Sequence, residues 1–118
     1  MTEKIFINFS NHPSEKWSKK QKSAARKYGK VTDIIFPVVD EAGDEAYIRC
    51  LADEYLDKIM EYKPSAVMCQ GEFCLSFVII TALKEKGITV LAACSKRIVK
   101  EIGEEKKSVF LFERFREY

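Results

Sequence analysis

The chain has 118 residues, 47% of them hydrophobic and 32% charged, with a formal net charge of +2. This length corresponds to one domain (1–118), and so high an apolar content excludes a disordered chain. A transmembrane helix is excluded because it needs about 20 apolar residues in succession. The start of the chain has no signal-peptide layout, so we expect a cytoplasmic protein. The small net charge excludes binding to duplex nucleic acid by bulk charge alone.

Two strands and two helices are predicted in the first half of the chain. The first strand, Lys4 to Phe9, ends in turn-forming residues and is followed by a helix from Ser14 to Tyr28 with apolar positions at helical spacing. The β-branched segment from Val31 to Val39 predicts the second strand. A helix then follows an N-cap at Asp44 and runs to Ile59, because its apolar residues recur at i, i+3 and i+4.

Three strands and two helices are predicted in the second half. Ala66 to Cys69 is predicted as a short buried strand, followed by a helix from Phe73 to Lys86 that Gly87 ends. Ile88 to Ala93 predicts the fourth strand and Ser108 to Phe112 the fifth. We expect a short helix between them, from an N-cap at Ser95 to Ile102, and so short a connection is compatible with an antiparallel last strand.

Strands that alternate with helices predict right-handed βαβ units and a mostly parallel sheet covered on both faces. We therefore expect a single three-layer, Rossmann-like α/β domain with about five strands. Two strand orders fit this reading. The first choice is 2-1-3-4-5 and the second is 3-2-1-4-5.

Clusters of mostly polar residues follow three of the predicted strands. They are Asn8, Ser10, Asn11 and His12 at the first strand, Gln70, Gly71, Glu72 and Phe73 after the third, and Ser95, Lys96 and Arg97 after the fourth. In the first-choice order these strands are neighbours, and ligands bind beyond the carboxyl ends of such strands, so the clusters are expected to form one crevice. Ordinary helix caps and tight turns are the simpler explanation of each cluster alone.

The chemistry of these clusters points to an anionic ligand. Two of them begin predicted helices, whose N–H groups and dipoles favour an anion. Lys96 and Arg97 add positive charge, and Gly71 permits a close approach of the backbone. Neither a dinucleotide-binding nor a P-loop glycine motif is present. The expected ligand is therefore a phosphorylated nucleotide.

No metal or cofactor is expected, because His12 is the only histidine and the four cysteines form no close C-x-x-C pair. Charge is unevenly distributed: residues 14–30 have a balance of +6 and residues 40–61 a balance of −6. Two solvated helix faces explain this asymmetry. The alternative is a basic face that steers an anionic ligand.

The helix from Phe73 to Lys86 is apolar all round, which predicts a partner. One stripe of it must cover the sheet, and this leaves Phe73, Phe77 and Ile80 to be buried elsewhere. A second copy of the chain would cover them, so we expect a homodimer. In the alternative, the C-terminal residues Phe115 and Tyr118 cover that face within one monomer.

One short motif resembles a known family. Asn8-Phe9-Ser10 followed by His12-Pro13, in a single domain of this size, resembles the small stand-alone CRISPR-associated proteins of type III systems. These include ring nucleases, which bind and degrade cyclic oligoadenylate second messengers. The resemblance implies a homodimer that cradles a cyclic oligoadenylate. It also implies metal-independent cleavage, in which a ribose 2′-OH attacks the adjacent phosphorus and leaves a 2′,3′-cyclic phosphate.

If the resemblance holds, each cluster has a part in this reaction. Ser10, Asn11 and Gln70 would position the ribose and the phosphate, and Lys96 and Arg97 would stabilise the transition state. His12 would be the acid/base group, with Glu72 as the alternative, although His12 fits a helix cap equally well.

Three other functions stay open on the sequence alone. The chain could be a nucleotide sensor without catalysis, or a nucleoside-processing enzyme of deoxyribosyltransferase type with Glu72 as nucleophile. The third reading is an interaction module whose basic first helix binds RNA, with an affinity that falls steeply with salt.

Overall fold

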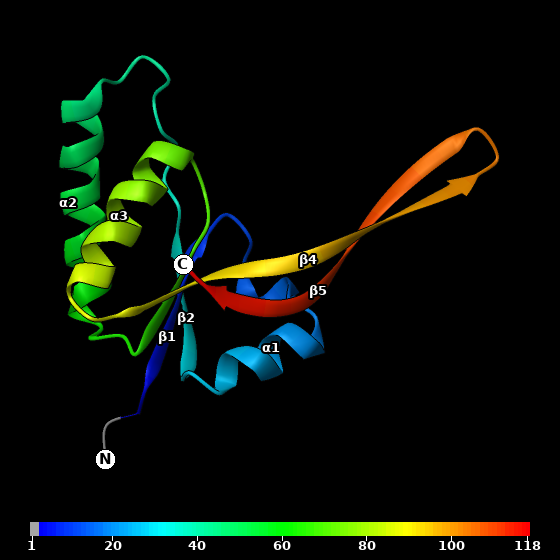
Figure 1. Cartoon of the computed structure of the whole chain (residues 1–118), viewed down its shortest axis with the longest axis horizontal. Helices are drawn as coiled ribbons and strands as arrows, with labels where there is room; N and C mark the ends of the chain where they lie inside the picture. Colours follow the sequence, from blue (N-terminus) through cyan, green and yellow to red (C-terminus); the bar gives the residue numbers. More distant parts are fainter. Residues whose placement is uncertain (1–2) are drawn as a thin grey trace.

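The computed structural model describes residues 3–118 and contains one five-stranded sheet in the order β2-β1-β3-β4-β5 (Figure 1). The first four strands are parallel: β1 (Ile5–Ser10), β2 (Lys30–Ile35), β3 (Ala66–Cys69) and β4 (Thr89–Ile102). The last strand, β5 (Glu105–Glu117), is antiparallel to β4. The predicted α/β class and the first-choice strand order are confirmed. The direction of the last strand, which the sequence left open, is antiparallel.

Helices cover both faces of the sheet (Figure 1). On one face lie α2 (Glu45–Glu61), which begins at the predicted N-cap Asp44, and α3 (Phe73–Glu85). On the other face lie the 3₁₀ turn η1 (Ser14–Lys16) and α1 (Lys19–Arg26). Within residues 3–118, none of the helices has the length and apolar character needed to cross a membrane.

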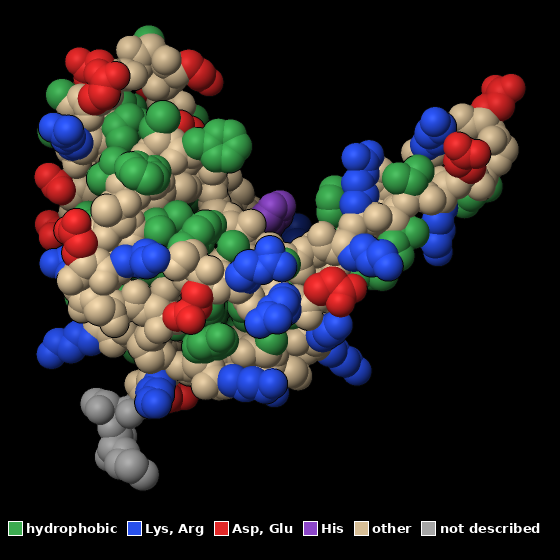
Figure 2. Space-filling view, in the orientation of Figure 1, with side chains coloured by type: hydrophobic (Ala, Val, Ile, Leu, Met, Phe, Trp, Pro, Cys, Tyr) green, Lys and Arg blue, Asp and Glu red, His purple; other side chains and the backbone are tan. Residues whose placement is uncertain are grey.

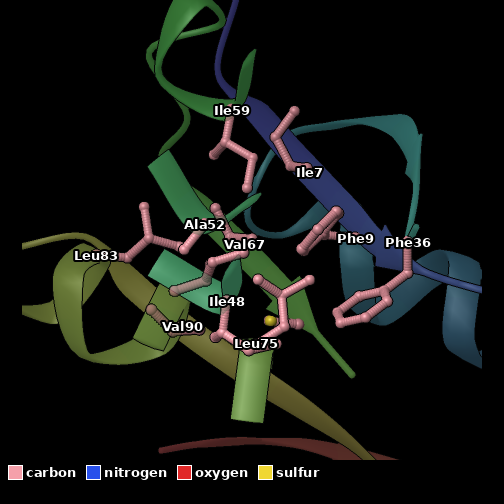
Figure 3. Close-up of a cluster of buried hydrophobic side chains, with 12 residues drawn as sticks. Ile7, Phe9, Phe36, Ile48, Ala52, Ile59, Val67, Leu75, Leu83 and Val90 are labelled. Carbon is pink, nitrogen blue, oxygen red and sulfur yellow. The ribbon is translucent and has the colours of Figure 1, made fainter. Parts of the chain in front are cut away.

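Alternation along β1 divides the core into two clusters. Ile7 and Phe9 pack with residues of α2 and α3, such as Ile48 and Leu75, on one face of the sheet (Figure 3). Phe6 packs on the opposite face with residues that include Trp17, Ala25 and Phe115. All four residues of β3 are buried, because helices cover both of its faces.

Two predicted boundaries in the first half are wrong. The helix expected over Ser14 to Tyr28 is interrupted, because Trp17 adopts extended backbone angles and its ring is buried against Phe6. The helix restarts as α1 behind Ser18, whose hydroxyl accepts the N–H of Gln21 (3.2 Å). The second strand ends at Ile35 instead of Val39.

The helix predicted from Ser95 to Ile102 is also wrong. β4 runs through this segment to Ile102 and turns back into β5 at Glu105, which is paired with Ile102. Gly103 has a φ of +63°, as the first central residue of a type II′ hairpin turn requires. The predicted fifth strand, Ser108 to Phe112, is only the middle of β5. Residues 96–111 form a two-stranded ribbon that projects from the sheet (Figure 1) and that we call the arm.

A β-bulge marks the base of the arm. Cys94 pairs with Arg114 and Ser95 with Phe112, so the register skips Glu113. This extra residue lets Phe112 and Phe115, three positions apart, lie on the same face, where their ring centroids are 4.9 Å apart. Bulges bend and twist a ribbon, so Glu113 sets the point at which the arm leaves the sheet.

Candidate functional site

The order of the strands reverses between β1 and β3, and the candidate site lies at this point. From β1 the chain passes to β2 on one side, and it later returns to β3 on the other side. Open α/β sheets bind ligands outside the carboxyl ends of strands at such a switch point. The loops that follow β1 and β3 meet there, because the Gln70 N–H donates to the Phe9 carbonyl (3.2 Å). Two of the three predicted clusters therefore lie side by side.

A polar network around the buried side chains of Asn8 and Ser10 fixes the loop after β1. The Asn8 amide donates to the carbonyl of His12 (2.8 Å) and to Asp33 Oδ1 (3.1 Å). The Ser10 hydroxyl donates to Asn8 Oδ1 (2.7 Å) and accepts the backbone N–H of His12 (3.2 Å). The other oxygen of Asp33 accepts the N–H of Ser14 (3.1 Å). Both backbone polar groups of His12 are thus held in place.

This network changes the expected roles of Asn8 and Ser10. Their side chains are only 1% and 4% exposed and bond to each other, so they position the loop and do not offer themselves to a ligand. Sequence reasoning missed Asp33. The signal was a lone carboxylate inside the apolar segment 31–39, and the register places Asp33 directly beside Asn8.

Asn11, His12 and Pro13 of this loop are exposed to solvent, and His12 and Asn11 offer polar side chains there. The imidazole lies in the hollow between the arm and the rest of the molecule, where it is the purple side chain of Figure 2. An exposed imidazole on a fixed backbone suits proton transfer, because a catalytic group must be held close to its working position.

Contacts within the protein account for Gln70 and Gly71 in the turn after β3. The Gln70 Oε1 accepts the N–H of Ala93 (2.8 Å) and so extends the link between β3 and β4 beyond their paired residues. At Gly71, a Cβ would lie 2.5 Å from the ring of Phe36. Contact with this ring explains the glycine without a phosphate.

Glu72 occupies the N-terminus of α3 with its own carboxylate. Its two oxygens accept the N–H groups of Leu75 (2.7 Å) and Cys74 (2.9 Å), and these bonds lower the pKa of the Glu72 carboxyl. A negative charge is therefore already present at this helix end, which disfavours the ligand anion expected there. A nucleophilic Glu72 would have to give up the cap.

The nearby cysteines are not activated as nucleophiles. Burial raises the pKa of the Cys69 thiol to about 12. The hydrogen bond with Glu72 and its negative charge raise the pKa of Cys74. Both thiols are therefore protonated at neutral pH, and the thiolate is the reactive form.

The third predicted cluster lies on a strand and begins no helix. Side chains alternate along β4, so Ser95 and Arg97 share the face that carries α1, whereas Lys96 lies on the face of α2 and α3. The Arg97 guanidinium donates to the hydroxyl of Ser108 across the arm (3.0 and 3.2 Å). Lys96 and Arg97 therefore do not form one cationic pair, and the helix dipole expected at Ser95 is absent from this described segment.

A groove of about 520 Å³ adjoins the site along α3. Its lining includes Gln70, Phe73, Phe77 and Tyr118. The Tyr118 hydroxyl donates to the Cys69 carbonyl (2.7 Å), so the end of β5 does reach this face. Phe115, however, packs on the opposite face of the sheet, and Phe73 and Phe77 remain 90% and 70% exposed. The C-terminal residues therefore cover the exposed apolar face of α3 only in part.

One comparison with known proteins places the chain in a family. The model of the Uncharacterized protein MJ1673 family matches residues 4–116, which run from β1 to the end region of β5 and include the arm. The chain belongs to this family. No curated protein matches the chain. The description of this family names no activity.

Proposed function

We propose that this chain binds a cyclic oligoadenylate at the switch point and cleaves it without a metal ion. The supporting observation is His12, an exposed imidazole whose backbone N–H and carbonyl are both held by the Asn8–Ser10 network. Such a loop keeps a proton-transfer group in place without using its side chain. The motif that resembles ring nucleases, Asn8-Phe9-Ser10 with His12, is the same segment.

The reaction is an in-line transfer within the ligand. The neutral imidazole of His12 takes the proton of a ribose 2′-OH while the 2′-oxygen forms a bond to the adjacent phosphorus. The bond from phosphorus to the 5′-oxygen breaks, and this oxygen receives a proton. The products are a 2′,3′-cyclic phosphate and a 5′-hydroxyl. Holding the 2′-oxygen and the phosphorus in line supplies most of the rate enhancement.

The remaining exposed groups of the site orient the ligand. Asn11 lies on the same loop as His12 and offers an amide to the ribose or the base. Lys96 is three residues along β4 from Ala93, the residue that Gln70 contacts, which is about 10 Å at the rise of a strand. Its ammonium group supplies positive charge to a ligand that extends over the site. A second messenger acts inside the cell, so the proposal implies a cytoplasmic protein.

Incubation with cyclic tetra-adenylate in EDTA tests the proposal. We expect linear products that end in a 2′,3′-cyclic phosphate, resolved by chromatography. His12→Ala should lower single-turnover cleavage by about 10²–10⁴ and leave the affinity nearly unchanged. Ser14→Ala, two residues further along and outside the groups that orient the ligand, is the matched control for a loss of loop structure and should retain most of the cleavage rate.

Two other outcomes have definite meanings. Tight binding without products would identify a sensor and remove the catalytic half of the proposal. No binding by calorimetry would overturn it entirely. The deoxyribosyltransferase reading predicts a sugar adduct on Glu72 by intact mass, and the engagement of both Glu72 oxygens disfavours it.

A further inference from the structure

The arm exposes apolar side chains on both of its faces. By register, Ile98, Ile102, Val109 and Leu111 share one face, together with Lys96, Lys100, Lys107 and Glu105. We call this the lysine face, and it lies on the side of the sheet that carries α2 and α3. The other face carries Val99 and Phe110, and Phe110 is 67% exposed. In Figure 2 green and blue side chains alternate along the arm.

Such a ribbon is not expected to stand alone in water. An isolated two-stranded hairpin is marginally stable at best, and it becomes stable when a third element covers it. A contiguous exposed apolar surface rimmed by polar groups marks a site of association. The arm therefore has the features of a segment that another molecule covers.

We propose that the arm docks onto a second copy of this chain, with its lysine face against the α2–α3 surface of the partner. The charges are complementary. The lysine face carries three lysines and one acid, whereas α2 presents a row of carboxylates at a spacing of four residues, Asp53, Asp57 and Glu61. Red side chains line the α2 edge of the molecule in Figure 2.

The exposed apolar area agrees with a dimer. Phe73 and Phe77 on α3 together expose roughly 240–400 Å². A stable interface of standard size buries about 800 Å² per partner. On the lysine face, Ile102, Val109 and Leu111 are 41–62% exposed, and together with the lysine stems between them they supply the remainder. Because each copy has both an arm and an α2–α3 surface, a two-fold axis satisfies both at once.

This proposal is independent of the proposed function, because it rests on the arm and requires no nucleotide. Sedimentation of the wild-type chain without ligand tests it first. We expect a species of twice 13.6 kDa at about 100 µM, with dissociation on dilution. A monomer throughout that range would overturn the proposal and leave the cleavage assay unaffected.

A charge exchange identifies the two surfaces. One variant carries Lys96→Glu, Lys100→Glu and Lys107→Glu on the arm, and the other carries Asp53→Lys, Asp57→Lys and Glu61→Lys on α2. Each alone juxtaposes like charges in its homodimer, so its dissociation constant should rise roughly 100-fold or more. A mixture of the two restores opposite charges at both contacts, and we expect it to form a heterodimer.

The matched control is Lys16→Glu, Lys19→Glu and Lys27→Glu, three exposed lysines around α1 and away from the arm. It changes the net charge by the same amount and should dimerise like the wild type. Unchanged circular dichroism shows that each variant is folded. If the arm variant dimerises like the wild type, or the mixture stays monomeric, the arm is not the docking element. Leu111→Ser, on the lysine face, leaves all charges in place and must also weaken the dimer.

Discussion

Two regions of this chain use the same kinds of residue to different ends. The body, which is every described residue outside the arm, buries most of its aromatic and β-branched side chains in two clusters on either face of the sheet, although Phe73 and Phe77 on α3 stay exposed. The arm is as rich in such residues, yet Val99, Ile102 and Phe110 are more than half exposed. The body therefore supplies its own stability, whereas the arm obtains its stability from contacts outside the monomer.

The largest expected effect contrasts one phenylalanine from each region. Phe6 is fully buried, and its ring packs against Trp17 and Phe115 (centroids 6.2 and 5.3 Å apart). Phe6→Ala should lower the free energy of unfolding by about 3–5 kcal/mol. Phe110→Ala should change it by no more than about 0.5 kcal/mol at concentrations where the chain is monomeric. Urea denaturation followed by Trp17 fluorescence measures both. Equal losses would make the arm part of the core.

The sequence predicts the body well because its signals there are local. Period-3.6 spacing in α2, a continuous apolar run in β3 and glycines at helix ends each identify an element from a few neighbouring residues. The local sequence of the arm does not distinguish a helix from a strand. Ile98, Val99 and Ile102 fit the apolar spacing of a helix as well as a strand, and the strand is decided by pairing with residues up to Leu111.

At the candidate site, the placement of the loops could likewise be predicted from the sequence, whereas the roles of single residues could not. The strand order predicted from βαβ alternation brings the loops after β1 and β3 together, as found. The roles of individual residues depend on partners distant in the sequence. Asp33 lies 25 residues from Asn8, and the Gln70 side chain bonds to Ala93, 23 residues away. The capping of α3 by Glu72 could not be predicted, because a glutamate that caps its own helix looks in sequence like a free carboxylate.

The next prediction concerns the polar network of the body. Asn8→Ala leaves buried hydrogen-bonding groups of Ser10 and His12 without their partner, so the free energy of unfolding should fall by about 1–3 kcal/mol. The loop should also lose its fixed position, seen as faster hydrogen exchange at the His12 amide. Asn11→Ala is the exposed control and should change neither quantity. A stable Asn8→Ala variant with a protected amide would show that the network does not hold the loop.

Two glycines with positive φ, one in the body and one in the arm, allow the stability of the two regions to be compared at equal backbone strain. Gly87, which follows the end of α3, and Gly103, at the tip of the arm, have φ of +78° and +63°, and no described atom lies within 4 Å of an added Cβ. Alanine at either site costs about 1 kcal/mol of backbone strain. We expect Gly87→Ala to lower the global stability by this amount. Gly103→Ala should leave global stability unchanged and increase hydrogen exchange only in residues 96–111.

If Gly103→Ala lowers the unfolding free energy as much as Gly87→Ala, the two regions unfold together. The comparison between a self-sufficient body and a dependent arm would then fail. Hydrogen exchange at several protein concentrations sharpens the result, because association should protect the arm amides and leave those of β1 and β3 unchanged.

The smallest effect lies at the start of α3 and depends on pH. Glu72→Gln keeps the size of the side chain but removes the charge that faces the N–H groups of Leu75 and Cys74. At pH 7 the loss should be near the lower end of the about 0.5–2 kcal/mol of an N-cap, because the carboxylate is exposed and screened. The folded-state pKa of Glu72 is lowered by these hydrogen bonds relative to its ordinary value of 4.5.

A lowered folded-state pKa gives the sign of this dependence. The stabilisation is fully present above the unfolded-state value and is lost as the pH falls through the lower folded-state value. The gap in stability between the wild type and Glu72→Gln should therefore be constant from pH 7 to about pH 5 and close as the pH falls toward about 3. Glu85→Gln, at the opposite end of α3, removes a carboxylate that the helix dipole disfavours, so it should be neutral or slightly stabilising at pH 7. A gap for Glu72→Gln that stays the same at pH 3 would mean that the amide side chain, and not the lost charge, causes the destabilisation.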